Sequence, residues 1–302
     1  MQAWIKMARL QFFPMAFIAY SMGAVASLRV SGRFDIPVYI MGYLPLFLIE
    51  LCTIMVNEYN DYESDRINRN FSMFTGGSRM LVEGRVKFQE VRIAIASVLA
   101  LIVFAGFLFL RVEKYASPAL VLGLFLAGSL MGLGYTIPPI KFSHRGFGEF
   151  VVGITHTFFL VICGYVFQTG SWLHYLPWML SIPLFFAVLA AIMLAGLPDR
   201  TADEAAAKRT IPVILGPKKA IVVAECFVTA AATSAILIYS LEFARWVIIL
   251  AVILIVPHCL ALLLSLVSLL RSNNFDRRID MIMGSSLTYI IWFGLIPLPS
   301  MF

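Results

Sequence analysis

Long apolar stretches separated by short polar segments occupy almost the whole chain. Each apolar stretch holds about 20 residues, the length with which an α-helix crosses a lipid bilayer. The pattern therefore predicts an all-α, polytopic membrane protein with about nine transmembrane helices. These helices are expected at residues 10–28, 37–56, 92–111, 116–135, 148–168, 172–196, 218–240, 244–269 and 280–300.

The composition supports this prediction. The chain has 302 residues, of which 61% are hydrophobic and 13% are charged. A soluble domain has no core large enough to bury so much apolar sequence, so the lipid bilayer is the expected partner. The net charge of +6 is modest and the sequence has no basic stripe, which argues against a nucleic-acid partner. The four cysteines are scattered, with neither metal-site nor disulfide spacing.

The first apolar stretch allows two interpretations. Lys6 and Arg9 precede it and Ala24-Val25-Ala26 lies near its end, as in a secretory signal peptide. Retention as a membrane helix is favoured, because the stretch is about long enough to cross the bilayer and many more follow.

Lysine and arginine gather on one side of the predicted membrane, which sets the expected orientation. With nine helices the chain ends lie on opposite sides, and the basic side includes the N-terminus. We expect an integral, multi-pass protein of the cell inner or plasma membrane, with its N-terminus and the loops after the second, fourth and sixth helices in the cytoplasm. The other side holds only Arg29, Arg33, Arg111, Lys114 and Arg245.

A polar motif follows the second apolar stretch, Asn57-Glu58-Tyr59-Asn60-Asp61-Tyr62-Glu63-Ser64-Asp65. Asn57, Asp61 and Asp65 recur every four residues, so on a helix they share one face. An acid in a membrane helix costs roughly 2.5–3.5 kcal/mol at the bilayer centre, and less toward the interface. A cation should compensate these acids, and Mg²⁺ carrying a diphosphate is the natural candidate.

A second acidic motif follows the sixth apolar stretch. Asp199 and Asp203 are again four residues apart, and Lys208-Arg209-Thr210 comes shortly after them. Two acidic faces at the ends of two membrane helices are expected to converge on one metal–diphosphate group.

Other residues near the predicted helix ends are candidates for binding a diphosphate or a cation. Lys141 and Arg145 follow the fourth stretch, where they would either bind diphosphate oxygens or anchor the chain at the membrane interface. Tyr135 lies one turn further in, where its ring would belong to an aromatic belt or stabilise a nearby cation. Gly76-Gly77-Ser78, followed by Arg79, would form either an anion-binding nest or a plain turn.

Ionisable residues also lie within the apolar stretches, and three of them are considered as parts of a site or core. Glu50 precedes Asn57 by seven residues on the same helical face, and an intramembrane acid of this kind is expected to line a cavity. His156 is interpreted as a core histidine with satisfied hydrogen bonds. Glu149, at the start of the fifth stretch, would cap the helix or face the site.

Together these motifs resemble the UbiA superfamily of intramembrane prenyltransferases, over residues 9 to about 220. That family's first motif, N-D-x-x-D-x-x-x-D, matches residues 57–65 with Glu58 replacing the first aspartate, and its D-x-x-x-D motif matches Asp199 and Asp203. Gly148-Glu149 and residues 164–170 resemble the menaquinone branch, which prenylates 1,4-dihydroxy-2-naphthoate. That branch usually has Asn and Arg before the second motif, where this chain has residues 195–198, Ala-Gly-Leu-Pro.

The resemblance implies one domain over residues 1–302, a helical bundle around a central cavity, and Mg²⁺-dependent transfer of a polyprenyl group from its diphosphate to an aromatic acceptor. One Mg²⁺ would be bound by Asn57, Asp61 and Asp65, and a second by Asp199 and Asp203. The catalytic set would comprise these four aspartates and Tyr135. The diphosphate would be bound by Asn57, Arg66, Lys141, Arg145 and Lys208.

Alternative functions remain open at this point. Prenyl transfer to a non-quinone acceptor would use the same motifs. A cation-coupled transporter would also place acids in membrane helices, although more often near the midplane and without adjoining basic clusters. A membrane alcohol phosphotransferase would use Asp-Gly pairs, which the sequence does not contain.

Overall fold

The structure, a computed structural model, describes residues 2–302, and every regular element in that range is helical. The elements are α1 (Gln2–Met7), η1 (Leu10–Phe12), α2 (Phe13–Ser31), α3 (Ile36–Asn60), α4 (Tyr62–Ile67), α5 (Phe88–Val112), α6 (Pro118–Leu133), η2 (Phe142–His144), α7 (Gly148–Ile154), η3 (Thr155–Phe159), α8 (Leu160–Thr169), α9 (Tyr175–Ala205), α10 (Ile211–Leu215), α11 (Pro217–Glu242), α12 (Arg245–Ser272), α13 (Asp280–Leu295) and η4 (Leu298–Ser300).

The predicted all-α membrane architecture is confirmed. Eight helical segments in the described residues are long and apolar enough to cross a membrane. The predicted fourth stretch corresponds to α6, which has 16 residues and is shorter than a typical span. The predicted fifth stretch is one span, residues 148–169, made of α7, η3 and α8.

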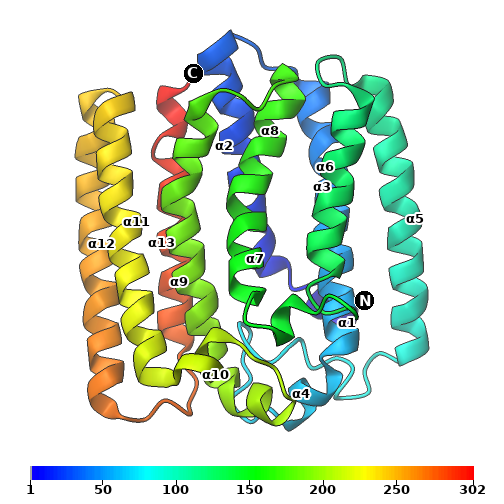
Figure 1. Ribbon diagram of the computed structural model, residues 1–302, viewed down its shortest axis with the longest axis vertical. Helices are drawn as coiled ribbons and strands as arrows, with labels where there is room; N and C mark the ends of the chain where they lie inside the picture. The colour runs from blue at the N-terminus through cyan, green and yellow to red at the C-terminus, as the bar shows by residue number, and fades with distance from the viewer. Residues whose placement is uncertain (1) are drawn as a thin grey trace.

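The long helices stand side by side along one common direction (Figure 1). α11 and α12 form the wall at one side of the bundle, and α5 stands at the opposite side. α9 lies between these walls and packs against α11, α13 and α7. The short helices α4 and α10 lie at one end of the bundle, and the C-terminus lies at the other end (Figure 1).

A close crossing joins α2 to α8, and small residues make it possible. A Cβ atom on Gly23 would stand 1.8 Å from the backbone oxygen of Val161, and one on Gly164 would stand 2.1 Å from that of Tyr20. No side chain fits in either gap, so the two backbones touch directly, as small residues allow in membrane helices. This crossing fixes the position of the fifth span relative to the first.

The helix α9 is longer than the sequence pattern predicts. The apolar stretch ends near residue 196, but the helix continues to Ala205 with Pro183 and Pro198 inside it. The second acidic motif therefore lies on the last turns of a membrane helix, as expected, with Asp199 and Asp203 one turn apart.

Candidate active site

A cavity of about 330 Å³ opens between the central helices at the end of the bundle that carries α4 and α10. α2, α3, α6, α9, α13 and the span of α7, η3 and α8 contribute to its wall. Acids and amides line one end, and further along the wall is mostly apolar. The apolar lining includes Phe12, Met15, Phe159, Leu160, Val188 and Ile290.

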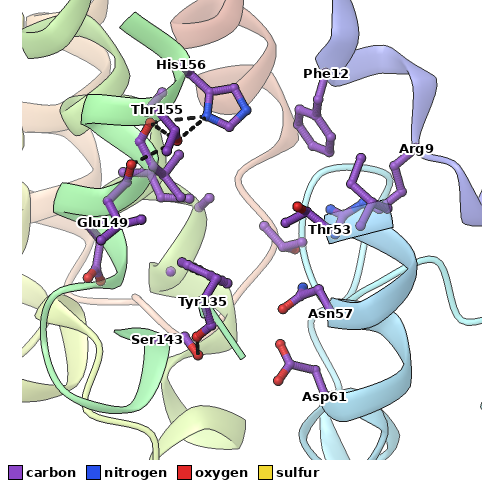
Figure 2. A pocket seen from close by; sticks show the side chains of 18 of the residues that line it. Arg9, Phe12, Thr53, Asn57, Asp61, Tyr135, Ser143, Glu149, Thr155 and His156 are labelled. Atoms are coloured by element: carbon purple, nitrogen blue, oxygen red, sulfur yellow. Dashed lines mark hydrogen bonds between the residues drawn. The ribbon is translucent and has the colours of Figure 1, made fainter. Parts of the chain in front are cut away.

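The first acidic motif lines the polar end of this cavity. α3 ends at Asn60, but the hydrogen-bond ladder continues, because the Asp61 N–H donates to Asn57 O at 2.8 Å and the Asp65 N–H donates to Asp61 O at 2.9 Å. Asn57, Asp61 and Asp65 therefore all line the cavity, as their four-residue spacing predicts. Figure 2 shows Asn57 and Asp61 one above the other at the C-terminal end of α3, both pointing into the cavity.

Glu58, which replaces an aspartate of the family motif, is buried away from the cavity lining. Its carboxylate accepts hydrogen bonds from the backbone N–H of Ser78, at 2.7 Å, and from the Ser78 hydroxyl. The guanidinium of Arg9 lies 4.0 Å from the same carboxylate and donates to Phe74 O at 2.8 Å. Glu58 thus fixes the loop after α4, and Arg9 reaches the cavity beside it.

The glycine pair in this loop packs against the acids. Gly76 and Gly77 have φ values of +72° and +67°, a left-handed conformation that favours glycine. The Gly76 N–H donates to Asp199 at 3.2 Å, and a Cβ on Gly77 would stand 2.1 Å from Asp65 Oδ2. Asn68 donates to the other oxygen of Asp199 at 2.7 Å. The loop therefore links the two acidic motifs through hydrogen bonds.

Lys208 lies between the two motifs. Its ammonium nitrogen is 2.8 Å from Asp61 Oδ2 and 3.6 Å from Asp203 Oδ1, and all three side chains are about nine-tenths buried. Burial alone would lower the pKa of Lys208, but the carboxylates of Asp61 and Asp203 outweigh it and raise that pKa. One ammonium group thus holds the acidic faces of α3 and α9 together.

Asp65 lies close to the other carboxylates of this cluster and is poorly solvated. Burial, together with the neighbouring carboxylates of Asp61 and Glu58, raises the pKa of Asp65 to about 8. Lys208 opposes this shift without overcoming it. A further cation at this end of the cavity would therefore be stabilised by the side chains already present.

The remaining predicted site residues divide into two groups. Tyr135 lines the cavity, and its ring lies against Gly148 at the start of α7. The structure does not place Arg66, Lys141 or Arg145 in the cavity lining. Arg66 pairs with exposed Glu63 at 2.8 Å, and exposed Arg145 donates to Pro139 O at 2.6 Å.

Residues from the apolar stretches also reach the cavity. Glu50 lines it as expected, and His156 lies across from it with Nε2 3.7 Å from Glu50 Oε1. The interpretation of His156 as a core histidine is therefore wrong, since η3 turns its ring toward the cavity (Figure 2). Glu149 faces the site, the second of its two expected positions, and its carboxylate accepts a hydrogen bond from the Ile211 N–H of α10 at 2.7 Å.

The polar end offers the ligand atoms that a hard divalent cation prefers. Asn57 Oδ1 and Asp61 Oδ1 are buried oxygens that accept no hydrogen bond, and Mg²⁺ binds oxygen ligands of this type. Within residues 2–302, no three acidic, histidine or cysteine side chains are already close enough to enclose a metal ion. Lys208 explains this spacing, because its ammonium group occupies the space between Asp61 and Asp203.

Comparison with known proteins gives a consistent result. The UbiA prenyltransferase family model matches residues 16–285, and a comparison with curated protein sequences gives no match. A solved UbiA homologue from Aeropyrum pernix K1 superposes with a TM-score of 0.68 at 18% identity, covering 95% of this chain and 98% of that one.

Two further solved structures share the fold over nearly their whole length. A UbiA homologue from Archaeoglobus fulgidus bound to GPP and Mg²⁺ has a TM-score of 0.65 at 14% identity, covering 98% of this chain and 99% of that one. A digeranylgeranylglyceryl phosphate synthase has a TM-score of 0.64 at 19% identity, covering 99% of this chain and 98% of that one. At these identities the likeness shows the fold alone.

Proposed function

From the premise that the chain belongs to the UbiA prenyltransferase family, we propose that it transfers a polyprenyl group from a prenyl diphosphate to an aromatic acceptor, with 1,4-dihydroxy-2-naphthoate as the first candidate. We propose further that residues 1–302 act as one domain. The observation that carries the proposal is the convergence of both acidic motifs at the polar end of an apolar cavity. Such a cavity matches a molecule with an anionic head and a hydrocarbon tail.

The donor and the metal are proposed from the residues and from a relative. The Archaeoglobus fulgidus homologue binds GPP and Mg²⁺, and the unpartnered oxygens of Asn57 and Asp61 suit the same ion. Asn57, Asp61 and Asp65 would hold one Mg²⁺, and Asp199 and Asp203 a second. Mg²⁺, when bound, supplies positive charge that stabilises the departing diphosphate.

Basic side chains of the chain itself would neutralise the remaining diphosphate charge. Lys208 and Arg9 already line the polar end of the cavity, so both would contact phosphate oxygens without large movement. Arg66, Lys141 and Arg145 lie outside the lining, so their proposed contribution requires the loops that carry them to move inward.

The proposed reaction needs an electron-rich acceptor and a dry cavity. The allylic C–O bond breaks, and its electron pair leaves with the diphosphate. The ring of Tyr135 would face the positive charge that develops on the allylic carbon. A ring carbon of the acceptor then supplies the electron pair of the new C–C bond, and its proton passes to a carboxylate or to the released diphosphate. The apolar wall would keep water from the cation.

The acceptor is the least constrained part of the proposal. Ala195 and Gly196 line the cavity just before the second acidic motif, where the menaquinone branch usually has Asn and Arg. They provide no charge for the carboxylate of a naphthoate, and Arg9, the arginine in the cavity lining, is already assigned to the diphosphate. An aromatic acceptor without a carboxylate is therefore the second candidate.

We also propose that the protein lies in the cell inner or plasma membrane with the polar end of the cavity in the cytoplasm. The excess of lysine and arginine in the loops at that end supports this orientation. Mg²⁺ would then enter from water, and the prenyl chain from lipid, because each exposed CH₂ costs about 0.8 kcal/mol in water.

The test is prenyl transfer by the purified protein in detergent, with a labelled all-trans prenyl diphosphate, Mg²⁺ and a panel of aromatic acceptors. We expect a labelled product that EDTA abolishes. Product with an acceptor other than the naphthoate would keep the reaction and replace the acceptor. No product with any acceptor, together with no Mg²⁺-dependent binding of the donor, would refute the proposal.

A further inference from the structure

The pair Glu50 and His156 stands apart from the acidic motifs in the same cavity. Glu50 precedes Asn57 by seven residues on α3, which places it about 10 Å further along the helix axis. Its Oε1 atom is buried and accepts no hydrogen bond, since His156 Nε2 at 3.7 Å lies beyond hydrogen-bond distance. A buried carboxylate oxygen without a hydrogen bond is costly inside a membrane span, so a role in function is the default expectation.

Hydrogen bonds fix which nitrogen of His156 carries a proton. The Thr155 hydroxyl donates to Val151 O at 2.8 Å, so its proton is already used. His156 Nδ1 lies 3.1 Å from Val152 O, and a carbonyl oxygen only accepts. Nδ1 therefore donates, and Nε2 is the nitrogen that faces Glu50 across the gap.

The gap between Nε2 and Oε1 suits a hydroxyl group. An oxygen about 2.8 Å from both atoms would complete a triangle on their 3.7 Å base. The hydroxyl would donate its proton to Glu50 and, when Nε2 is protonated, accept a hydrogen bond from His156. A methyl ether at the same place would leave the carboxylate unsatisfied.

A π-helical turn and nearby aromatic rings surround this pair in the cavity. His156 belongs to η3, a five-residue π-helical turn, and such turns are frequent at functional sites. Phe12 lies across the cavity from His156 (Figure 2), and Phe159 of η3 also lines it. Flat aromatic faces near a hydroxyl-binding pair suit a planar aromatic ring.

Another intramembrane histidine shows what a structural role looks like. His258 uses both ring nitrogens, accepting from Trp292 Nε1 at 3.0 Å and donating to Ser285 at 3.0 Å. Glu225 on α11 also has a carboxylate oxygen without a hydrogen bond, but it is not part of the cavity lining. Of these histidines, His156 is the one that keeps a nitrogen available to the cavity.

We propose that Glu50 and His156 form the acceptor subsite and bind a ring hydroxyl of a phenolic or naphtholic acceptor. This inference rests on the proposed function. The hydrogen bond to Glu50 draws the hydroxyl proton away from the ring, raises the electron density of the ring, and orients it with its reactive carbon toward the polar end of the cavity.

The test measures binding, so that it does not depend on turnover. The purified full chain, in detergent with Mg²⁺ and inorganic diphosphate, is equilibrated with 1-naphthol, with its methyl ether 1-methoxynaphthalene, and with the aliphatic alcohol 1-tetralol. The wild type is expected to bind 1-naphthol about tenfold more tightly than the ether, the effect of one hydrogen bond to a charged group. It should also bind 1-naphthol more tightly than 1-tetralol, because a phenolic proton is the stronger donor.

Variants then show which residues cause the preference for 1-naphthol over its methyl ether. Glu50→Leu and His156→Leu should lose the preference for 1-naphthol over the ether, and Glu50→Gln should retain part of it through its amide oxygen. Glu225→Gln is the matched control, since it removes an intramembrane acid outside the cavity, and it should keep the full preference. Mg²⁺-dependent binding of prenyl diphosphate by every variant verifies that the polar end is folded.

The outcomes separate the two hypotheses. Equal wild-type affinities for 1-naphthol and the ether, or a full preference retained by Glu50→Leu, would overturn the subsite. Equal affinities for 1-naphthol and 1-tetralol would overturn its aromatic assignment. A preference for 1-naphthol together with no prenyl product and no Mg²⁺-dependent donor binding would refute the proposed function and leave the hydroxyl subsite standing. A prenyl product without a preference for 1-naphthol would overturn the subsite and leave the proposed function standing.

Discussion

Replacing Gly77 with alanine tests whether the loop after α4 positions the acid Asp65. The new Cβ would stand 2.1 Å from Asp65 Oδ2 and 2.7 Å from its Cγ. Contacts of this kind do not occur below about 3 Å, so the carboxylate has to move by roughly 1 Å. A misplacement of 1 Å in a catalytic group costs about 100-fold in rate, which corresponds to about 2.7 kcal/mol of transition-state stabilisation.

Gly84 provides the matched control for the backbone. It has φ +65°, nearly the +67° of Gly77, but nothing lies within 4 Å of the position of its Cβ. Both Gly→Ala variants therefore cost about 1–2 kcal/mol for the left-handed conformation, and only Gly77→Ala displaces Asp65.

The assay compares kcat/KM for prenyl transfer and the thermal midpoint of both variants in detergent. Gly77→Ala should lose about 100-fold in kcat/KM, and Gly84→Ala should stay within a few-fold of the wild type while losing stability. Equal activity of the two variants would refute the idea that the loop sets the position of Asp65.

Three further predictions follow from the same contacts. Asp61→Asn and Asp199→Asn should each abolish prenyl transfer while circular dichroism shows an unchanged helical content, and near-wild-type turnover of either would make that motif structural. Lys208→Met leaves the carboxylates of Asp61 and Asp203 without the ammonium group that bridges them, so it should lower the free energy of unfolding by about 3–5 kcal/mol in EDTA. Added Mg²⁺ should restore part of this loss. An unchanged melting temperature in EDTA would contradict the bridge. Gly23→Ala forces α2 away from α8 and should cost about 1–3 kcal/mol, whereas Gly123→Ala, with no atom near its Cβ, should melt like the wild type in the same experiment.

The sequence predicted the membrane helices well, because apolar length is a direct physical requirement of the bilayer. The end of α9 was predicted less well. Pro198 and the polar residues after it resemble the end of a helix, but Asp199 and Asp203 turn into a polar cavity, so the helix continues to Ala205. A pattern along one helix carries no information about the neighbours that make such a continuation favourable.

The site was predicted where residues share one helix and missed where they meet only in space. The four-residue spacing indicated that Asn57, Asp61 and Asp65 lie together, and they all line the cavity. Arg9 and Asn68 reach the site from segments that are distant in sequence from their partners, and no spacing rule joins them. The core interpretation of His156 failed because it rested only on the apolar neighbours of this residue in the sequence, which do not show that the ring lines a cavity.

The π-helical turn η3 also has a consequence for insertions and deletions in the fifth span. It accommodates one more residue than an α-helical turn, so the extra residue is absorbed locally and the residues after it keep the facing that a regular helix would give them. Deleting one residue within η3 would restore a regular helix and leave Gly164 against α2. The same deletion would change the direction of the His156 side chain, which lines the cavity. The packing of this span against α2 therefore does not depend on the π turn, whereas the side chains that η3 carries into the cavity do.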